Sequence, residues 1–305
     1  MKIARAKQVS NRKRRNPFNK SQAELTGLLI PAVLLVFVFS YLPMVGLIIS
    51  FKDYKYNLGI FGSEWVGLDN FKYAFISNDF YIILRNTILY NLTFIVMGIV
   101  FGVLIALMLD AVGKRTFIKV FQSGMFLPHF LSWIVVSYIS YAFLDVNVGI
   151  INKTLMKFGM QKISFYSEAK YWPFILCCFN VWKTMGFNSL VYYGAILGIS
   201  PELYEAAAID GCSYFRRVWH VTFPQLKSTV IILVLMSLGG IFHSDYGMFF
   251  YLPKDIGALY KTTDVIDTYI LRTLRLSGSV GGASAVGFLQ SIVGFIVVIT
   301  ANALV

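Results

Sequence analysis

Residues able to do acid–base, metal or nucleophilic chemistry are few and scattered in this 305-residue chain. The three histidines stand far apart, at His129, His220 and His243. No His-Glu-x-x-His, Cys-x-x-Cys or nucleophile-elbow pattern occurs. The stretch Val112–Thr116 (VGKRT) contains Gly-Lys without the glycine-rich loop that a P-loop needs, so the chain does not bind ATP in that way. We expect no catalytic residues, no metal site and no cofactor in this chain.

The composition indicates an integral membrane protein. Hydrophobic residues make up 57% of the chain and charged residues 14%, whereas a soluble domain is usually about 25% charged. The three cysteines form no disulfide framework, because Cys177 and Cys178 are adjacent in an apolar run and Cys212 lies in a polar segment. Polar chemistry must therefore be done by side chains within membrane-spanning helices or by the loops between them.

Six apolar runs are long enough to span a bilayer, which takes about 20 residues. Two prolines in the first run, Pro31 and Pro43, predict a kink there. The predicted spans are Leu25–Ser50, Ile82–Leu109, Phe117–Phe143, Tyr171–Leu197, Ser228–Phe250 and Ala283–Leu304.

A basic tail, residues 1–24, precedes this membrane domain, residues 25–305. The tail holds eight cations and no acid among its first twenty residues: Lys2, Arg5, Lys7, Arg12, Lys13, Arg14, Arg15 and Lys20. Because a long apolar run follows at once, we interpret the tail as the cytoplasmic flank that sets orientation rather than a nucleic-acid-binding segment. A basic flank is also expected beyond Val305.

This orientation assigns the loops to the two sides of the membrane. The loops Asp110–Thr116 and Gly198–Lys227 face the cytoplasm, and Lys114, Arg115 and Lys119 support the assignment. The other three loops, Phe51–Tyr81, Leu144–Lys170 and Tyr251–Gly282, face outward.

The inner loop at residues 198–227 is unusual because it is polar and helix-forming between two spans. Ser200 and Pro201 suit a helix start, and ELYEAAAID has high helix propensity. Gly211 suits the position just past a helix end. Ser213 can cap a second short helix, which Pro224 is expected to end. The residues alone leave two interpretations open: an interfacial amphipathic linker, or a docking knob whose small alanines let a partner approach.

The spacing in this loop resembles the EAA motif of ABC importer permeases. Glu205-Ala206-Ala207 is followed after three residues by Gly211, and nine residues later by Val221-Thr222-Phe223-Pro224. Val221 and Phe223 depart from the commonest letters of that motif but keep apolar character. The stretches Phe126–Val136, Asn180–Gly211 and Thr262–Arg272 are similar to the carbohydrate-uptake branch, nearest to its subfamily for oligosaccharides and polysaccharide fragments.

The resemblance covers nearly all of the chain after the tail and implies an all-α membrane protein with six transmembrane helices. It implies the type I ABC importer permease fold with a cytoplasmic coupling helix, in a bacterial cytoplasmic membrane. The implied partners are a second homologous permease, two ATPase subunits that bind ATP and Mg²⁺, and an extracytoplasmic solute-binding protein. The cargo would be an oligosaccharide, and this chain would be a non-catalytic subunit.

The same resemblance implies which loop residues meet the ATPase. Glu205 would pair with a cation of the ATPase, Ala206 and Ala207 would permit close packing, and Gly211 would allow the elbow. The predicted coupling residues are Glu205, Ala206, Ala207, Asp210 and Gly211.

Sugar recognition needs hydrogen-bonding groups and aromatic faces, and polar groups in a span normally face the interior of the helix bundle. The predicted substrate-binding residues are Asn86, Asn91, Trp133, Asn180, Trp182, Asn188, Tyr192, Tyr193, Asp245 and Tyr246. For each of them helix–helix hydrogen bonding or interfacial anchoring is the competing interpretation. Gly98-x-x-x-Gly102 is interpreted as close helix packing.

Lys183 stands well inside an apolar span, where a lysine is costly unless it is paired or hydrated. It can attract an anionic sugar, pair with Asp245 or with an acid of the partner permease, or extend toward the outer surface. We favour a structural role for it.

Two other classes of membrane protein compete with an importer subunit. A stand-alone secondary transporter for a polar solute needs an ion-coupling site, usually with internal repeats and broken helices. An intramembrane enzyme needs a catalytic pair or a metal cluster at matched depth. The sequence shows no repeat, carboxylate trio or such cluster in its spans, and neither class accounts for the EAA spacing.

Overall fold

The computed structural model describes residues 20–76, 78–113 and 115–304. The first nineteen residues of the predicted basic tail therefore lie outside the described residues. The chain divides into two compact units, Met1–Ile48 and Ile49–Val305, which are called unit 1 and unit 2 below. Each unit is described by itself.

Unit 1 contains the first predicted span. Helix α1 (Lys20–Val36) continues through a π-turn, η1 (Phe37–Tyr41), into a 3₁₀ stretch, η2 (Leu42–Phe51), whose last residues belong to unit 2. Residues Leu25–Phe51 form a helical stretch long and apolar enough to cross a membrane, and they coincide with the predicted span. Its change from α to 3₁₀ geometry occurs beside Pro43, because proline has no amide hydrogen to continue the α pattern.

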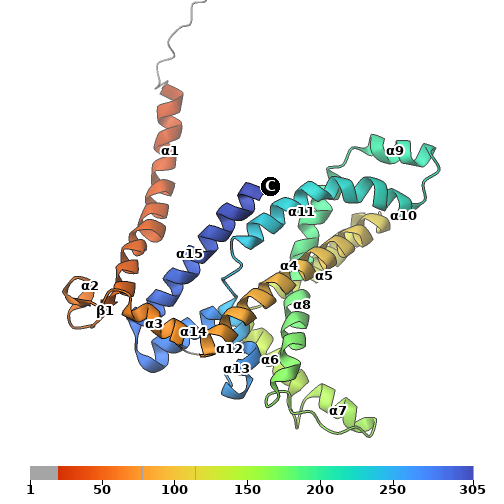
Figure 1. The fold of residues 1–305 in the computed structure, drawn as a ribbon. Helices are drawn as coiled ribbons and strands as arrows, with labels where there is room; N and C mark the ends of the chain where they lie inside the picture. Colours follow the sequence, from red (N-terminus) through yellow and green to blue (C-terminus); the bar gives the residue numbers. More distant parts are fainter. Residues whose placement is uncertain (1–19, 77, 114, 305) are drawn as a thin grey trace, which may run out of the picture. The chain divides into compact units, whose positions relative to one another are not determined.

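Three more predicted spans coincide with single long helices in unit 2. They are α4 (Asn78–Val112), α8 (Trp172–Leu197) and α15 (Val280–Leu304). Each is long and apolar enough to cross a membrane. Figure 1 shows α4 crossing α8, and these two helices form the main packing pair of the unit.

The third predicted span is broken. It consists of α5 (Arg115–Phe126), the 3₁₀ turn η3 (Leu127–Phe130) and α6 (Trp133–Leu144), and its two halves meet at 98°. Pro128 lies in the turn, and Ser132 caps α6 by accepting a hydrogen bond from the amide of Val135. With this bent pair counted as one, the described residues contain six candidate spans.

The fifth span differs from its prediction. One helix runs from Tyr214 to Leu238 through α10 (Tyr214–Arg217), the π-turn η5 (Val218–Thr222) and α11 (Phe223–Leu238). The expectation that Pro224 ends a short helix was therefore wrong. Pro224 lies in the first turn of α11, and the wide π-turn before it accommodates the missing amide hydrogen. The helix ends at Leu238, and residues 239–245 form a non-helical break before α12 (Tyr246–Tyr251).

Close helix packing around α8 depends on glycines. A Cβ at Gly102 of α4 would lie 2.8 Å from the ring of Tyr192, and one at Gly98 would lie 3.0 Å from the amide of Asn188. Helix packing was the predicted role of this glycine pair, and the structure confirms it. A Cβ at Gly186 would lie 2.1 Å from the carbonyl oxygen of Met125, so α8 and the end of α5 touch backbone to backbone.

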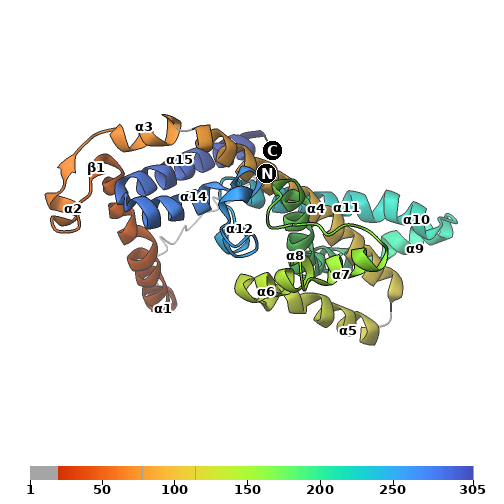
Figure 2. The same ribbon diagram turned by 90° about the horizontal axis from the view of Figure 1, so that it is seen from below.

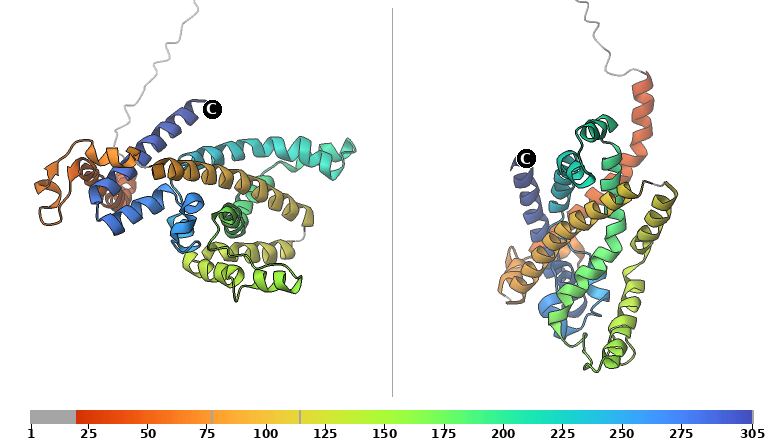
Figure 3. Two further views of the ribbon diagram at one scale, coloured as in Figure 1. Left: turned by 60° about the horizontal axis from the view of Figure 1, so that its bottom comes forward. Right: turned by 90° about the vertical axis from the view of Figure 1, so that its right-hand side faces the viewer.

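Two groups of short elements lie at opposite ends of unit 2. Helix α9 (Pro201–Ile209) and α10 lie at one end, and α7 (Ile150–Lys157) and α13 (Tyr260–Thr263) lie at the other (Figures 1 and 3). Figure 2 shows α3 (Asp69–Ile76) and α14 (Ile266–Arg272) beside α15, and both helices pack against it. The remaining short elements are α2 (Gly59–Gly62), η4 (Ala169–Tyr171), η6 (Gly257–Leu259) and η7 (Thr273–Ser277).

A small hairpin is the one sheet among the described residues. Strands β1 (Lys52–Asp53) and β2 (Glu64–Trp65) pair antiparallel. Buried Lys52 donates hydrogen bonds to the carbonyl oxygens of Ile60 and Ser63, at 2.8 and 3.2 Å. The ammonium therefore holds the hairpin loop closed, and the fold is otherwise helical, as predicted.

Candidate functional site

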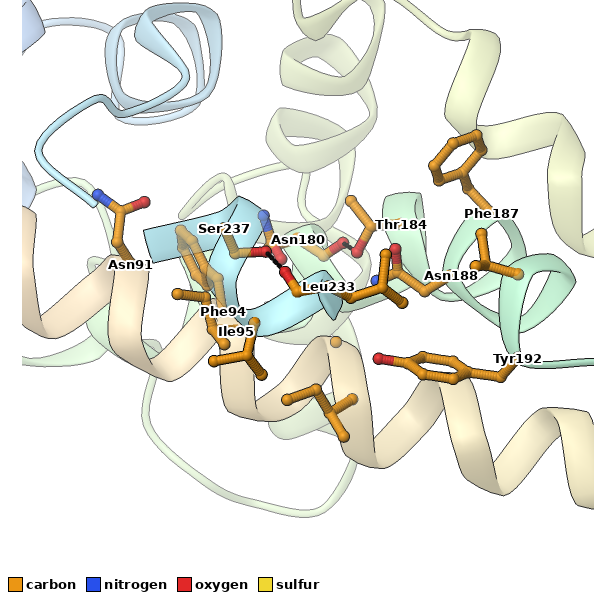
Figure 4. A pocket seen from close by; sticks show the side chains of 14 residues that line it. Asn91, Phe94, Ile95, Asn180, Thr184, Phe187, Asn188, Tyr192, Leu233 and Ser237 are labelled. Atoms are coloured by element: carbon orange, nitrogen blue, oxygen red, sulfur yellow. Dashed lines mark hydrogen bonds between the residues drawn. The ribbon is translucent and has the colours of Figure 1, made fainter. Parts of the chain in front are cut away.

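A cavity of about 310 Å³ lies between α4, α8 and α11 (Figure 4). Four of the predicted substrate-binding residues line it together: Asn91, Asn180, Asn188 and Tyr192. All of its lining residues are uncharged. The cavity therefore offers hydrogen bonds and apolar surface without a fixed charge.

The polar groups of the cavity differ in how far they are already bonded. The hydroxyls of Thr184 and Ser237 donate to carbonyl oxygens of their own helices, those of Asn180 and Leu233, each at 2.8 Å. The amide nitrogen of Asn180 has only a long contact, 3.9 Å, to the sulfur of Met248. Asn188 lines the cavity and has no hydrogen bond within the part of the chain that the structure describes, so its amide is still available to a solute.

Aromatic rings supply the apolar part of the cavity wall. Phe94 comes from α4, and Phe187 and Tyr192 come from α8 (Figure 4). Phe187 is itself held by His129, whose ring stacks on it at a centroid distance of 4.8 Å. Rings beside amides form the kind of surface that binds a sugar, because a sugar presents both C–H faces and hydroxyls.

Side chains from three helices fix the non-helical break at residues 239–245, next to the cavity. The amide nitrogen of Asn91 donates to the carbonyl oxygen of Ile241 at 2.9 Å and to the hydroxyl of Ser244 at 3.2 Å. Gln290 of α15 donates to the carbonyl oxygen of Phe242, and Asp267 of α14 accepts from the amide of Ser244 at 2.7 Å. The bonds to the break hold it in one conformation.

Asp267 is partly buried at this break. Burial raises the pKa of its carboxyl, and the hydrogen bonds from Ser244 and Gln290 act in the opposite direction. His243 lies 3.9 Å from the carboxylate. The Asp267 carboxylate thus binds the backbone of the break and does not line the cavity.

Lys183 has the structural role that we favoured. It is 9% exposed and donates to the carbonyl oxygens of His129 and Leu131, at 2.8 and 2.6 Å, in the bend of the third span. Its ammonium also lies 5.2 Å from the ring centre of Trp133. The indole N–H of Trp133 in turn donates to the carboxylate of Asp245. Lys183 and Asp245 are thus linked through an indole rather than paired directly.

Six of the predicted substrate-binding residues lie outside this cavity. Asn86 is buried, and its amide donates to the carbonyl oxygens of Lys261 and Asp264. Trp133 and Asp245 bond to each other, and Tyr246 packs on Phe250. The other two, Trp182 and Tyr193, pack against buried apolar clusters.

The sequence interpretation missed Thr184, Ser237, Phe94 and Phe187 as cavity residues. A stripe at four-residue spacing, Asn180, Thr184 and Asn188, lies on one face of α8 and could have identified Thr184. No comparable signal marks Ser237, because one serine in a span is common and its partners come from other helices.

The loop with the EAA spacing forms a second candidate site. Helix α9 follows Ser200 and begins at Pro201, and Gly211 has φ +70°, so both predicted features are confirmed. The hydroxyls of Ser200 and Ser213 make no capping bond, although both residues stand at the cap positions. Glu205, Ala206, Asp210 and Gly211 are exposed, whereas Ala207 is buried.

Contacts from α9 and α10 hold this loop on the ends of the long helices. The hydroxyls of Tyr204 and Thr222 are 3.1 Å apart, which ties α9 to the helix that follows it. Tyr214 donates to the carbonyl oxygen of Leu107 in α4, also at 3.1 Å. Beyond these anchors, Ile209 and Phe215 are 87% and 83% exposed. The loop therefore presents acidic and apolar side chains from a fixed backbone.

Residues 98–304 match a family described as "binding-protein-dependent transport system inner membrane component". Protein LplB of Bacillus subtilis (strain 168) is 34% identical over 90% of this chain and 86% of its own length. The polygalacturonan/rhamnogalacturonan transport system permease protein YteP of the same organism is 32% identical over 93% and 88%.

A solved structure agrees with these relatives. It is the crystal structure of a bacterial ABC transporter involved in the import of the acidic polysaccharide alginate. One of its chains is 30% identical to this protein and superimposes with a TM-score of 0.83, over 93% of this chain and 96% of that chain. A related structure holds the alginate transporter with an alginate pentasaccharide-bound periplasmic protein.

Proposed function

The chain belongs to the family of binding-protein-dependent transport system inner membrane components, and we propose that it forms one half of the pathway of an ABC importer for oligosaccharides. In this role it binds the solute between its spans and receives the force for transport from a separate ATPase. The family describes a transport component, and the predicted type I permease fold agrees with the solved alginate transporter chain.

The cavity between α4, α8 and α11 is the single observation that carries the substrate class. Three asparagine amides, two hydroxyls and three aromatic rings converge there: Asn91, Asn180, Asn188, Thr184, Ser237, Phe94, Phe187 and Tyr192. Amides both donate and accept, which suits the hydroxyls of a sugar. The lining holds no cation for a carboxylate. The charge of an acidic sugar would have to be met elsewhere in the transporter.

The exposed loop of α9 supports coupling to an ATPase. We assign Glu205 and Asp210 to cations of the ATPase, with Ala206 and exposed Ile209 giving close apolar contact. Buried Ala207 instead packs α9 against the chain's own helix, and Gly211 provides the elbow. ATP and Mg²⁺ then act on the partner subunits, and the tyrosine anchors pass the movement of α9 to α11 and α4.

The remaining partners follow from this assignment. A second, homologous permease supplies the other half of the cavity, and an extracytoplasmic binding protein delivers the sugar to the end of unit 2 that carries α7 and α13. The basic tail and the α9 loop face the cytoplasm of a bacterial cell membrane. No nucleic acid takes part.

Assembly is tested first, by gentle detergent pull-down of the chain with mass spectrometry of the bound proteins. The intact chain should bring down an ATPase and a second permease. A scramble of Glu205–Gly211 should lose the ATPase and keep the permease. If the chain comes down alone in both cases, the importer proposal is wrong and the secondary-transporter alternative takes its place.

Substrate binding is tested separately, in proteoliposomes of the assembled complex. Asn188→Ala removes an unbonded amide from the cavity and should lower the initial rate of uptake at low oligosaccharide concentration by about fivefold, the effect of one hydrogen bond. Asn302→Ala, at an exposed asparagine near the end of α15, is the matched control and should leave uptake unchanged. Equal uptake by both variants would remove the cavity from the proposal while leaving assembly intact.

A further inference from the structure

A groove of about 590 Å³ runs between α4 and α8 on a face that the transport site does not use. Its floor and walls include Leu89, Thr93 and Met97 of α4 and Phe174 and Cys177 of α8. Arg85 is the lining residue nearest the start of α4, and this end of the groove is called its mouth. This set is called the Arg85 groove below.

The Arg85 groove faces away from the cavity. Arg85, Leu89, Thr93 and Met97 recur every four residues and so share one face of α4. Asn91, which lines the cavity, is two residues from Leu89, a rotation of about 200° around the helix. The groove therefore opens toward lipid or a neighbouring chain rather than into the transport pathway.

The mouth of the groove is cationic and only partly satisfied. One guanidinium nitrogen of Arg85 donates to the side-chain oxygen of Asn86 at 2.9 Å and to the carbonyl oxygen of Lys261 at 3.3 Å. No carboxylate pairs with Arg85 or Lys261 among the residues that the structure describes. Both side chains are exposed. The guanidinium thus retains donors for an anion at the mouth.

The apolar part of the groove has the length of one membrane leaflet. Arg85 and Met97 are twelve residues apart in α4, which is about 18 Å along the helix. Half of a bilayer's hydrocarbon core is about 15 Å. Leu89 and Phe174 are 55% and 75% exposed, so both sides of the groove offer bare apolar surface.

We infer that the Arg85 groove binds an anionic phospholipid, with the phosphate at Arg85 and an acyl chain between α4 and α8. A guanidinium fork matches the oxygens of a phosphate. The charge of this exposed guanidinium beside bare apolar surface suits a lipid with an acidic headgroup. Exposed Lys261, whose carbonyl oxygen accepts from Arg85, adds a second cation to this part of the chain.

Charge argues against a helix of a second copy as the occupant. The chain's own first span, Leu25–Ser50, contains no aspartate or glutamate that would answer Arg85. A neighbouring groove on the other side of Phe174, lined by Ile139, Phe143, Ile175 and Trp182 among others, is apolar and has no cation at its mouth. It provides an internal control on the same helix.

The test uses the assembled complex in nanodiscs of phosphatidylcholine with one fifth phosphatidylglycerol. A photoreactive residue replaces Leu89 in the Arg85 groove or Ile139 in the control groove, and mass spectrometry identifies the lipid adducts. In the adducts at position 89 the ratio of phosphatidylglycerol to phosphatidylcholine should be about five times the bulk ratio, the effect of one basic side chain near an anionic headgroup. Adducts at position 139 should match the bulk share.

Two substitutions at the mouth complete the test. Arg85→Gln should return the adducts at position 89 to the bulk share, while Arg85→Lys, which keeps the charge, should retain most of the enrichment. Thermal unfolding of both variants checks that each is folded, and we expect both to unfold cooperatively. Three outcomes would each overturn the inference. The adducts at position 89 could match the bulk lipid composition when Arg85 is present, the enrichment could persist in Arg85→Gln, or the adducts could be to another protein chain.

Discussion

The α9 loop and the interior around Lys183 differ in what their charged side chains bind. In the interior, Lys183 donates to backbone carbonyl oxygens of the bent third span, and Asp267 accepts from Ser244 at the break before α12. In the α9 loop, Glu205 and Asp210 are exposed and have no side-chain partner among the residues that the structure describes. Charge inside the protein is committed to the fold, and charge in the loop is available to a partner.

This contrast separates residues that hold the helices from residues that act on something else. Asn188 is an interior residue of the second kind, because it lines the cavity and makes no hydrogen bond among the described residues. The general expectation follows: interior substitutions should first reduce stability, and loop substitutions should first reduce coupling.

The largest expected effect tests the interior half of the comparison. In Gly186→Ala the new Cβ would lie 2.1 Å from the carbonyl oxygen and 2.5 Å from the carbonyl carbon of Met125. Backbone atoms cannot move aside as a side chain does, so α8 and α5 must separate. We expect a loss of about 3 kcal/mol in the free energy of unfolding, at the upper end for overpacking, measured by thermal unfolding in detergent.

Gly194→Ala is the matched control in the same helix, because a Cβ there meets nothing within 4 Å. It should be neutral or slightly stabilising, since alanine favours the helix. Equal stability of the two variants would show that the contact between α8 and α5 is not a tight one.

The next effect concerns the buried cation. Lys183→Met removes the ammonium that the carbonyl oxygens of His129 and Leu131 accept from, while keeping most of the side-chain volume. Those carbonyl oxygens in the bend then have no hydrogen-bond donor, and we expect the free energy of unfolding to fall by about 2–3 kcal/mol. Thermal unfolding measures it, with Lys227→Met, an exposed lysine of α11, as the control.

An anionic-sugar role for Lys183 predicts a different outcome. Lys183→Met would then unfold at the same temperature as the unsubstituted protein and lose uptake of acidic oligosaccharides alone. Lys183 would then bind substrate rather than hold the helices, and the distinction between interior charges that stabilise the fold and loop charges that bind a partner would not hold.

The sequence was enough to predict the helical class and most of the spans. Long apolar runs with few charged residues identify α4, α8 and α15, because a span is defined by composition over about 20 residues. Gly211 was predicted for the same local reason, since a helix end needs a residue that accepts positive φ.

Features set by contacts between distant residues were harder to predict. The continuous helix through Pro224 depends on a π-turn, and the break at residues 239–245 is fixed by Asn91, Asp267 and Gln290 from three other helices. The polar residues of the spans were all visible in the sequence. Which of them face the cavity follows from helix rotation and crossing, and these are settled only by packing.

A smaller effect tests the loop half of the comparison. Gly211 has φ +70°, and a Cβ there meets nothing within 4 Å, so Gly211→Ala adds backbone strain without a clash. We expect the free energy of unfolding to fall by about 1 kcal/mol. We also expect the sugar-loaded binding protein to stimulate ATP hydrolysis less. Gly211→Asn is the control, because asparagine tolerates this conformation better, and it should lie between alanine and glycine in both measurements.

The smallest expected effect concerns the link between α9 and the long fifth helix. Tyr204→Phe removes one hydroxyl from the pair with Thr222, 3.1 Å away, and keeps the ring that lies 5.7 Å from the guanidinium carbon of Arg217. We expect the free energy of unfolding to fall by about 0.5–1 kcal/mol. Transport per ATP hydrolysed should fall clearly, because the loop would still dock on the ATPase but would pass less of its movement to α11. Tyr138→Phe, at an exposed tyrosine of α6, is the control for loss of a hydroxyl. Unchanged transport per ATP in Tyr204→Phe would mean that force reaches the spans through Tyr214 and α4, and that the loop's anchors are not equivalent.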